Sequence, residues 1–469
     1  MAEQVMTTKN KALQINLDPS IYGTISEIGG GQEVSRHFFQ AGGASGTIAK
    51  TISAYDKTFS DTLYNKGGKG RYVSEGRLEK MLQKEYNELV KTLEEGRGND
   101  TKFFVFGNTV ETLNYHKTNQ GHGWLGVRFR LDPKKEANTV IIHVNLLEND
   151  GILQQYTLGA LGVNLVYACF NHSKKPNSFL RSLMENLDRD RVEVNYIKMF
   201  GPDLDYVDNR LLGVQLVKNK MTMAVMFDRQ GQVQQPSDML YKKNVIVLRG
   251  TFRPITYVGF DMLKTSVGLC RKEADYQKED TVVLCEMNLE RLMRKGDEID
   301  EKDFLDRVDM LNGMGQYVMV SGFFEFYKLS DYFSSFKLKA LRMLLGANTL
   351  EKIFDDIHYK DLNGGLLQAM GLLFNEKTKL LIYPFKKKEN NELITTDNFY
   401  LPVKYQYLYQ HLLSNQFIIP ITEYRKNILG IHSKNVLDKI LKGDSSWEED
   451  VPKYISEMIK NRKLFGYKE

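Results

Sequence analysis

Glycine and hydroxyl residues with the spacing of an anion-binding turn follow an apolar run at Asn244–Leu248. They are Gly250, Thr251, Thr256 and Gly259, of which the last two lie at the expected start of a helix, and Phe252 lies in the same turn. Where a tight turn joins a buried strand to a helix, the free backbone N–H groups of the first helical turn and the helix dipole favour an anion. The segment therefore predicts an anion site, although many α/β proteins begin in the same way.

A second glycine-rich segment, Gly42 to Thr47, reads Gly-Gly-Ala-Ser-Gly-Thr and precedes an expected helix with Lys50 one turn in. Backbone N–H groups around Gly43, Ser45 and Gly46 would form an anion nest, and Lys50 would neutralise the bound charge. No Gly-Lys-Ser/Thr follows, so this is not a Walker loop.

An acid–base pair is predicted just before this nest. Three glycines, residues 29 to 31, lead into an expected helix on which Glu33 and His37 are four residues apart and share a face. Glu33 would orient His37 for proton transfer. The alternative for both glycine clusters is a pair of turns flanking a helix whose charges pair at the surface.

Three segments of the second half resemble motifs of one enzyme family. The turn RGTFRPITYVGF (249–260) resembles the GTFDPIHxGH signature of nicotinate-nucleotide adenylyltransferases, in the HxGH nucleotidyltransferase superfamily. LRMLLGANTLEKIFDDIHY (341–359) resembles that family's GADxL segment, and IHSKNVLDKILK (431–442) resembles its ISSTxIR helix start. The segments occur in the family's order and span most of residues 244–469, and the whole chain is similar to a group of bacterial proteins of this length.

The resemblance implies adenylyl transfer from ATP to a pyridine mononucleotide in NAD biosynthesis, with Mg²⁺ as the usual companion of ATP. Gly250 and Thr251, with Phe252 in the same turn, would let the backbone approach the phosphates. Thr256 and the helical turn that holds Gly259 would face the triphosphate. Gly346 and Asn348 would lie beside the adenosine, and Ser433 would begin a helix directed at a phosphate.

The sequence also departs from the family motifs. Arg253 stands in place of the aspartate of GTFDP, Phe260 in place of the second histidine, and Asn348 in place of the acid of GADxL. Arg253 and Thr256 are therefore the candidate catalytic residues of this half, with Arg253 restoring positive charge from a new position. Loss of a phosphate-contacting donor removes about 3 kcal/mol of transition-state stabilisation, so these departures could abolish catalysis. Two functions therefore stay open: a nucleotidyltransferase, or a non-catalytic nucleotide-sensing or scaffold protein with the same fold.

Strand-like and helix-like periods alternate along the chain, which predicts two tandem Rossmann-like α/β lobes with mostly parallel sheets. The first lobe is expected at residues 1–240, with a first strand at Ala12–Leu17 and an α+β insertion at about 40–138. The second is expected at 241–469, with C-terminal helices. In that lobe the turns after Leu248 and Leu345 should lie side by side at one crevice, because ligands bind at the carboxyl ends of parallel strands.

The two lobes also suggest an internal duplication. Apolar runs at Thr139–Leu146, Val163–Phe170 and Met223–Phe227 match those at Thr281–Leu289, Tyr317–Phe323 and Leu380–Phe385 in order and approximate spacing. The alternative is that any two α/β segments alternate in this way.

Composition limits the classes of partner. The net charge of +5 over 469 residues is small, so a nucleic-acid partner is not expected, and a nucleotide or other phosphorylated small molecule is. No apolar run approaches the roughly 18 residues that would predict a membrane span. Three isolated cysteines and a polar N-terminus predict a reduced, cytoplasmic protein. The scattered histidines predict no structural metal, and a homo-oligomer remains open.

Overall fold

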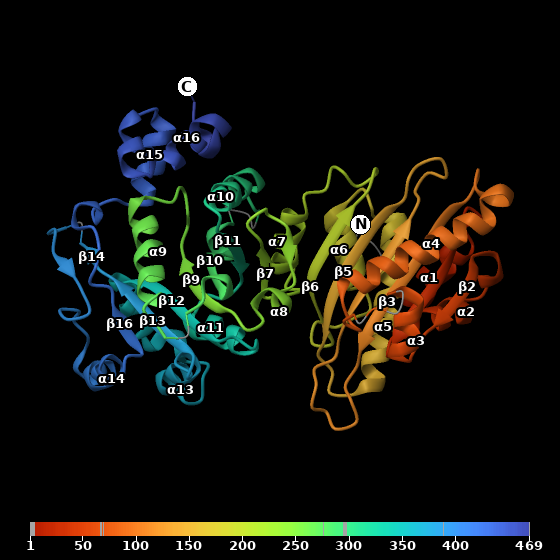
Figure 1. Cartoon of the computed structure of the whole chain (residues 1–469), viewed down its shortest axis with the longest axis horizontal. Helices are drawn as coiled ribbons and strands as arrows, with labels where there is room; N and C mark the ends of the chain where they lie inside the picture. Colours follow the sequence, from red (N-terminus) through yellow and green to blue (C-terminus); the bar gives the residue numbers. More distant parts are fainter. Residues whose placement is uncertain are drawn as a thin grey trace. The chain divides into compact units, whose positions relative to one another are not determined.

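The computed structural model describes residues 5–65, 68, 70–274, 276–293, 298–387 and 389–468, so the first four residues of the polar N-terminus lie outside them. The chain divides into two compact units, Met1–Thr222 and Met223–Glu469 (Figure 1). Each unit is an α/β lobe, which confirms the predicted class of fold. The division falls before the expected boundary at residue 240, because the segment after Thr222 pairs with the second sheet.

The first unit contains a six-stranded mixed sheet in the order β2-β1-β3-β4-β5-β6. Its strands are β1 (Ile21–Gly29), β2 (Ile48–Ser53), β3 (Lys102–Glu111), β4 (His122–Phe129), β5 (Asn138–Leu146) and β6 (Val192–Phe200). Strand β1 is parallel to β2 and β3, whereas β3 to β6 form an antiparallel meander.

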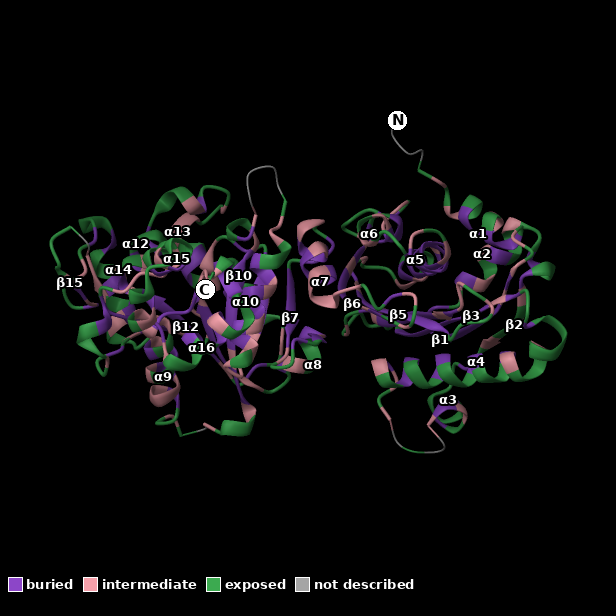
Figure 2. Cartoon of the chain, turned by 90° about the horizontal axis from the view of Figure 1, so that it is seen from above, coloured by how far each residue is buried: buried purple, intermediate pink, exposed green. Residues whose placement is uncertain are grey.

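Helices cover both faces of the first sheet. They are α1 (Thr8–Asn16), α2 (Val34–Ala41), α3 (Lys57–Tyr64), α4 (Glu75–Arg97), α5 (Gly151–Asn171), α6 (Pro176–Leu183) and α7 (Asn209–Lys218). Figure 2 shows α3 and α4 beneath the sheet and α1, α2, α5 and α6 above it. The expected insertion at 40–138 is therefore wrong, because β2, β3 and β4 are strands of the main sheet.

Two segments predicted as strands are helical. Ala12–Leu17 falls largely within α1, whose N-cap Thr7 accepts a hydrogen bond from the Asn10 N–H. Val163–Phe170 lies inside α5, which Asp150 caps by accepting from the N–H groups of Ile152 and Leu153. This run is apolar all round because α5 packs between the sheet and neighbouring helices, and period alone does not separate such a helix from a buried strand.

The second unit contains an eight-stranded sheet in the order β16-β13-β12-β9-β10-β11-β7-β8. Its strands are β7 (Ala224–Phe227), β8 (Val233–Gln234), β9 (Asn244–Arg249), β10 (Thr281–Asn288), β11 (Tyr317–Ser321), β12 (Ala340–Gly346), β13 (Thr378–Tyr383) and β16 (Ile418–Pro420). Strands β16 to β11 are all parallel, and β7 and β8 add an antiparallel edge. A separate hairpin joins β14 (Phe385–Lys386) to β15 (Leu393–Ile394).

The helices of this unit follow the parallel strands. They are α8 (Pro236–Leu240), α9 (Tyr257–Cys270), α10 (Glu301–Gly313), α11 (Phe326–Ser334), α12 (Leu350–Ile353), α13 (Gly365–Leu373), α14 (Val403–Ser414), α15 (Ser433–Lys442) and α16 (Lys453–Arg462). Taken in chain order, the six parallel strands occupy sheet positions 3-2-1-4-5-6, the doubly wound arrangement. The direction of winding reverses between β9 and β12, so a crevice opens at their carboxyl ends.

The two sheets do not correspond as a duplication requires. Val163–Phe170, matched to β11, is helical, and Met223–Phe227, matched to β13, contains β7 of the second sheet. The predicted internal repeat is therefore wrong, and the shared α/β rhythm explains the similar spacing.

Among the residues that the structure describes, no helix combines the length and apolar character needed to cross a membrane.

Candidate functional site

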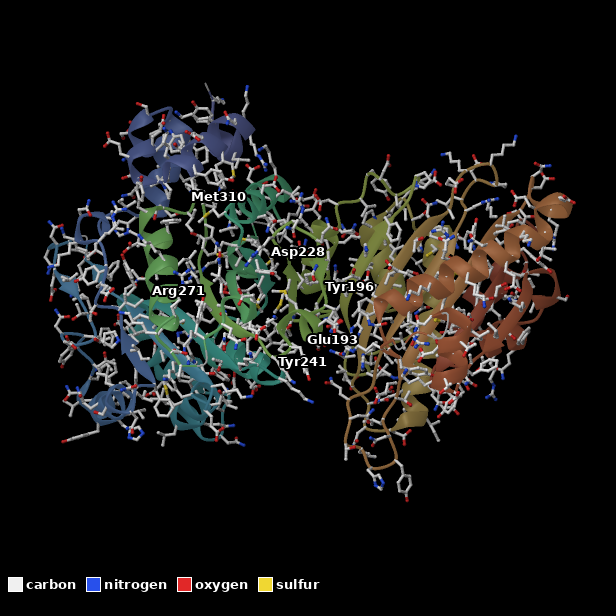
Figure 3. The ribbon with its side chains drawn as sticks, in the orientation of Figure 1. Glu193, Tyr196, Asp228, Tyr241, Arg271 and Met310 are labelled. Atoms are coloured by element: carbon white, nitrogen blue, oxygen red, sulfur yellow. The ribbon has the colours of Figure 1, made fainter. Side chains whose placement is uncertain are left out.

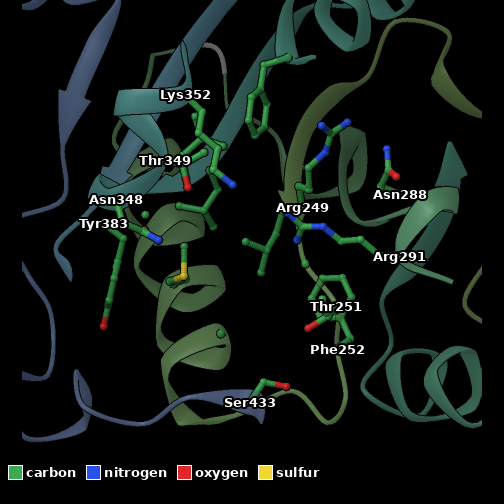
Figure 4. Close-up of a pocket in the computed structure, with 18 of the residues that line it drawn as sticks. Arg249, Thr251, Phe252, Asn288, Arg291, Asn348, Thr349, Lys352, Tyr383 and Ser433 are labelled. Carbon is green, nitrogen blue, oxygen red and sulfur yellow. The ribbon is translucent and has the colours of Figure 1, made fainter. Parts of the chain in front are cut away.

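A cavity of about 400 Å³ lies at the carboxyl ends of β9 and β12 (Figure 4). The two strands are direct neighbours, and Leu248 is paired with Leu344. The turns after Leu248 and Leu345 therefore meet at one crevice, as the sequence predicted. Eight of the predicted site residues line the cavity together: Gly250, Thr251, Phe252, Thr256, Gly259, Gly346, Asn348 and Ser433.

The turn between β9 and α9 is tightly folded. A Cβ atom on Gly250 would lie 2.8 Å from the ring of Phe252, so the turn has no room for a side chain there. The Thr251 carbonyl accepts a hydrogen bond from Nη1 of the buried Arg307 at 3.1 Å. These contacts fix the backbone that forms one wall of the cavity.

Helix α9 begins at this wall without a side-chain cap. Its N-cap residue, Thr256, is buried and makes no capping hydrogen bond. Val258 and Gly259, in the first turn of the helix, line the cavity. Uncapped N–H groups and the helix dipole favour a negative group at this position.

A second helix start reaches the same cavity. Ser433 begins α15, and its hydroxyl donates to the Pro254 carbonyl at 2.9 Å. The N-cap residue, His432, makes no capping hydrogen bond. Ser433 thus ties α15 to the β9 turn and completes the set of three resembling segments at one site.

Arg253 does not join them. Its Nε lies 2.6 Å from Oδ1 of Asp303, on α10, and Asp303 is also paired with Arg307. The side chain is not part of the cavity lining, so its charge is used in holding the turn against α10. The expectation that Arg253 restores positive charge at the site is therefore wrong.

The sequence reasoning missed Arg249, the last residue of β9, which lines the cavity. Its Nε and Nη2 donate to both oxygens of the fully buried Glu286 on β10, at 2.6 and 3.2 Å. It also donates to the carbonyls of Phe323 and Phe324, at 2.9 and 2.7 Å, and lies over the ring of Phe326. The signal in the sequence was a pair of isolated charges. Arg249 directly follows the apolar run Asn244–Leu248, and Glu286 is the single charge within the apolar run Thr281–Leu289.

Two more cations of the lining were missed, Arg291 and Lys352. Arg291 ends the 3-10 helix η3 (Leu289–Arg291) after β10, and Lys352 lies on α12 after β12. Their positions just beyond the carboxyl ends of two strands could have identified them in the sequence, because the carboxyl ends of parallel strands lie along one edge of the sheet.

The predicted anion nest of the first unit takes another form. Lys50 lies on β2 and not on a helix, and its Nζ is 2.6 Å from Glu85 and 3.4 Å from Glu88, both on α4. Gly43, Ser45 and Gly46 lie in or beside the short 3-10 helix η1 (Ala44–Gly46). Because two carboxylates already hold Lys50, it is not available to neutralise a bound anion.

Glu33 and His37 are not joined by a side-chain hydrogen bond within the described part of the chain. Glu33 lies 3.5 Å from Arg36, which corresponds to the alternative of surface pairing. Burial lowers the pKa of His37. The His37 ring packs against Gly159 of α5, where a Cβ atom would lie 3.0 Å from the ring.

Two histidines in contact, the buried His143 and the partly exposed His122, lie elsewhere in the first sheet. His143 Nε2 is 3.1 Å from His122 Nδ1, and His143 Nδ1 is 2.7 Å from Asn195 Oδ1. Burial lowers the pKa of His143 to about 3. The packing of His143 against Trp124 indicates a structural role.

The described residues contain no group of three or more His, Cys, Asp or Glu side chains placed to hold a metal ion. Glu290 and Glu325 are the carboxylates of the cavity lining, and Glu325 is paired with Lys328. This donor set fits a Mg²⁺ ion only if the phosphates and water supply most of its ligands, which is the usual pattern for Mg²⁺ bound with a nucleotide.

The fold and cavity define a doubly wound α/β unit with a ligand crevice at its switch point. No family model matches the chain, and no curated protein matches it. Among solved structures, the competence/damage inducible protein CihA from Agrobacterium tumefaciens is similar at 14% identity, over 35% of this chain and 93% of that chain. The TM-score is 0.24, too low to support a shared fold or function.

Proposed function

We propose that the second unit binds a phosphorylated nucleotide at the switch point and transfers an adenylyl group from ATP to a pyridine mononucleotide. The observation that supports this is the convergence of three family-like segments, at residues 249–260, 341–359 and 431–442, on one cavity of about 400 Å³. That volume is within the usual size range of a small-molecule site.

In this reaction a phosphate oxygen of the mononucleotide attacks the α-phosphorus of ATP, and the bond to the pyrophosphate leaving group breaks. Catalysis of this kind depends on positioning and on stabilising negative charge. The uncapped N–H groups of α9 and α15 supply fixed partial positive charge, and Gly250 and Gly346 allow close backbone approach. Mg²⁺, when bound with ATP, would neutralise phosphate charge.

The alternative is a nucleotide sensor that binds without turnover. It is favoured by Phe260 in place of a motif histidine and by the ion pair that removes Arg253 from the cavity. The binding step is common to both functions.

Titration calorimetry with ATP, nicotinate mononucleotide and NAD, combined with a pyrophosphate-release assay, tests the proposal. Binding of ATP and mononucleotide with release of pyrophosphate is the expected result. Binding without release would establish the sensor in place of the enzyme, and no binding by any of the three ligands would refute both.

A further inference from the structure

Two cations of the cavity lining, Arg291 and Lys352, have no ion pair or hydrogen bond to any residue that the structure describes. Arg291 comes from the segment after β10 and Lys352 from the segment after β12, on either side of β9. Both side chains are exposed and extend into the cavity (Figure 4). Their charge is therefore available to a ligand.

Most other charged side chains near the cavity have an ion-pair partner. Arg249 is paired with Glu286, Arg253 with Asp303, and Glu325 with Lys328. Glu290 is the remaining acid of the lining without a described partner. The available side-chain charge thus has a positive excess, carried by Arg291 and Lys352.

Neither cation belongs to the segment that begins α15. Figure 4 places Lys352 and Ser433 at opposite ends of the cavity, and Arg291 reaches inward from the β10 side. We infer that Arg291 and Lys352 form a two-sided clamp for the phosphate chain of the ligand. The ligand class is a nucleotide with two or more phosphates, because a polyphosphate has several charged oxygens along its length and can contact cations from two different strand ends.

This inference rests on the proposed function in taking the switch-point cavity as the nucleotide site. It adds that the phosphate chain reaches the ends of β10 and β12, at the side of the cavity away from the start of α15. Because inorganic pyrophosphate lacks the base and sugar, it probes the clamp separately from nucleotide recognition.

Calorimetric titration of the full chain with ATP, sodium pyrophosphate and adenosine tests the clamp in Arg291→Ala and Lys352→Ala. Each substitution should weaken ATP and pyrophosphate binding by about tenfold or more, because each removes a charge-assisted hydrogen bond to the phosphates. Adenosine affinity should not change. Lys337→Ala removes an exposed lysine outside the cavity lining and is the matched control.

Unchanged ATP affinity in both variants would overturn the clamp while leaving nucleotide binding in place. If no nucleotide binds but pyrophosphate binds and both variants weaken it, the two cations bind a phosphate chain, whereas the nucleotide as ligand class and the proposed function both fail. Failure of the wild-type protein to bind either ATP or pyrophosphate would refute both.

Discussion

At the scale of single residues, a substitution of Thr256 tests whether the ligand meets the start of α9, because it should change ATP affinity and protein stability in different directions. It is the N-cap of α9 but makes no capping hydrogen bond. In Thr256→Asp the carboxylate would accept from the first N–H groups of α9, as aspartate commonly does at this position. We expect ATP affinity to fall at least about tenfold, because the carboxylate occupies these donors and repels the phosphates.

The free energy of unfolding of Thr256→Asp should stay the same or rise by up to about 1 kcal/mol. Calorimetry and chemical denaturation measure the two quantities, with Thr256→Ser as the conservative control. An ATP affinity within twofold of the wild type would show that the start of α9 does not meet the ligand.

His143 should make the stability of the first unit depend on pH. Its pKa is about 3 in the folded protein, lowered mainly by burial, against about 6.5 when unfolded. Below pH 6.5 the unfolded chain binds a proton that the folded protein does not, so stability falls as the pH falls toward 3. Between pH 7 and pH 5 this group should remove about 2 kcal/mol from the free energy of unfolding.

The pH effect is measured by urea denaturation of the wild type and of His143→Gln at both pH values. The variant is less stable throughout, but its loss between pH 7 and pH 5 should be smaller by that amount. Equal losses in the two proteins would contradict the buried, neutral state of His143.

At the scale of elements, the contact of α5 with α2 depends on glycine. A Cβ atom on Gly162 would lie 2.3 Å from Val34 Cγ2, whereas a Cβ on Gly96, in α4, would meet nothing within 4 Å. Alanine is favoured over glycine in both helices by about 1 kcal/mol in intrinsic propensity. Gly96→Ala should therefore stabilise the first unit slightly, while Gly162→Ala should destabilise it by roughly 1–3 kcal/mol through overpacking.

Thermal or urea denaturation of the two glycine variants provides the measurement. Because both substitutions add one methyl group to a helix, their difference isolates the packing at α2. Stabilisation by Gly162→Ala would contradict the close approach of the two helices.

The elements also show what sequence could predict. The prediction that the β9 turn and the end of β12 lie together is confirmed, because both follow apolar strands of a parallel α/β rhythm. Two predictions of element type were wrong. Val163–Phe170 was expected to be a strand but lies in α5, because a helix buried on all sides lacks the polar face that identifies a helix. Lys50 was expected on a helix but lies on the strand β2, which follows the glycines. The Arg249–Glu286 pair needs the knowledge that β9 and β10 are neighbours in register, which one sequence does not contain.

At the scale of the whole molecule, the unit that begins at Met223 should function alone. We expect a fragment of residues 223–469 to fold and to bind ATP as the full chain does, because the cavity is lined entirely from within it. A fragment of residues 241–469 should be markedly less stable, because it loses β7, β8 and α8, exposing the β11 edge and the apolar surface that Ala224, Met226 and Leu240 cover.

Calorimetry and circular-dichroism melting of both fragments provide the measurement. Equal stability of the two fragments would show that the second unit begins near residue 241, as the sequence alone suggested.

The antiparallel pairing of β7 with β11 has a consequence for synthesis on the ribosome. Strand β7 ends at Phe227 and its partner begins at Tyr317, so 317 − 227 = 90 residues must be added before the pair can form. At about 5–20 residues per second this takes roughly 5–18 s. During that interval the first unit can be complete while β7 still lacks its partner β11, so the apolar side chains of β7 are accessible to a chaperone.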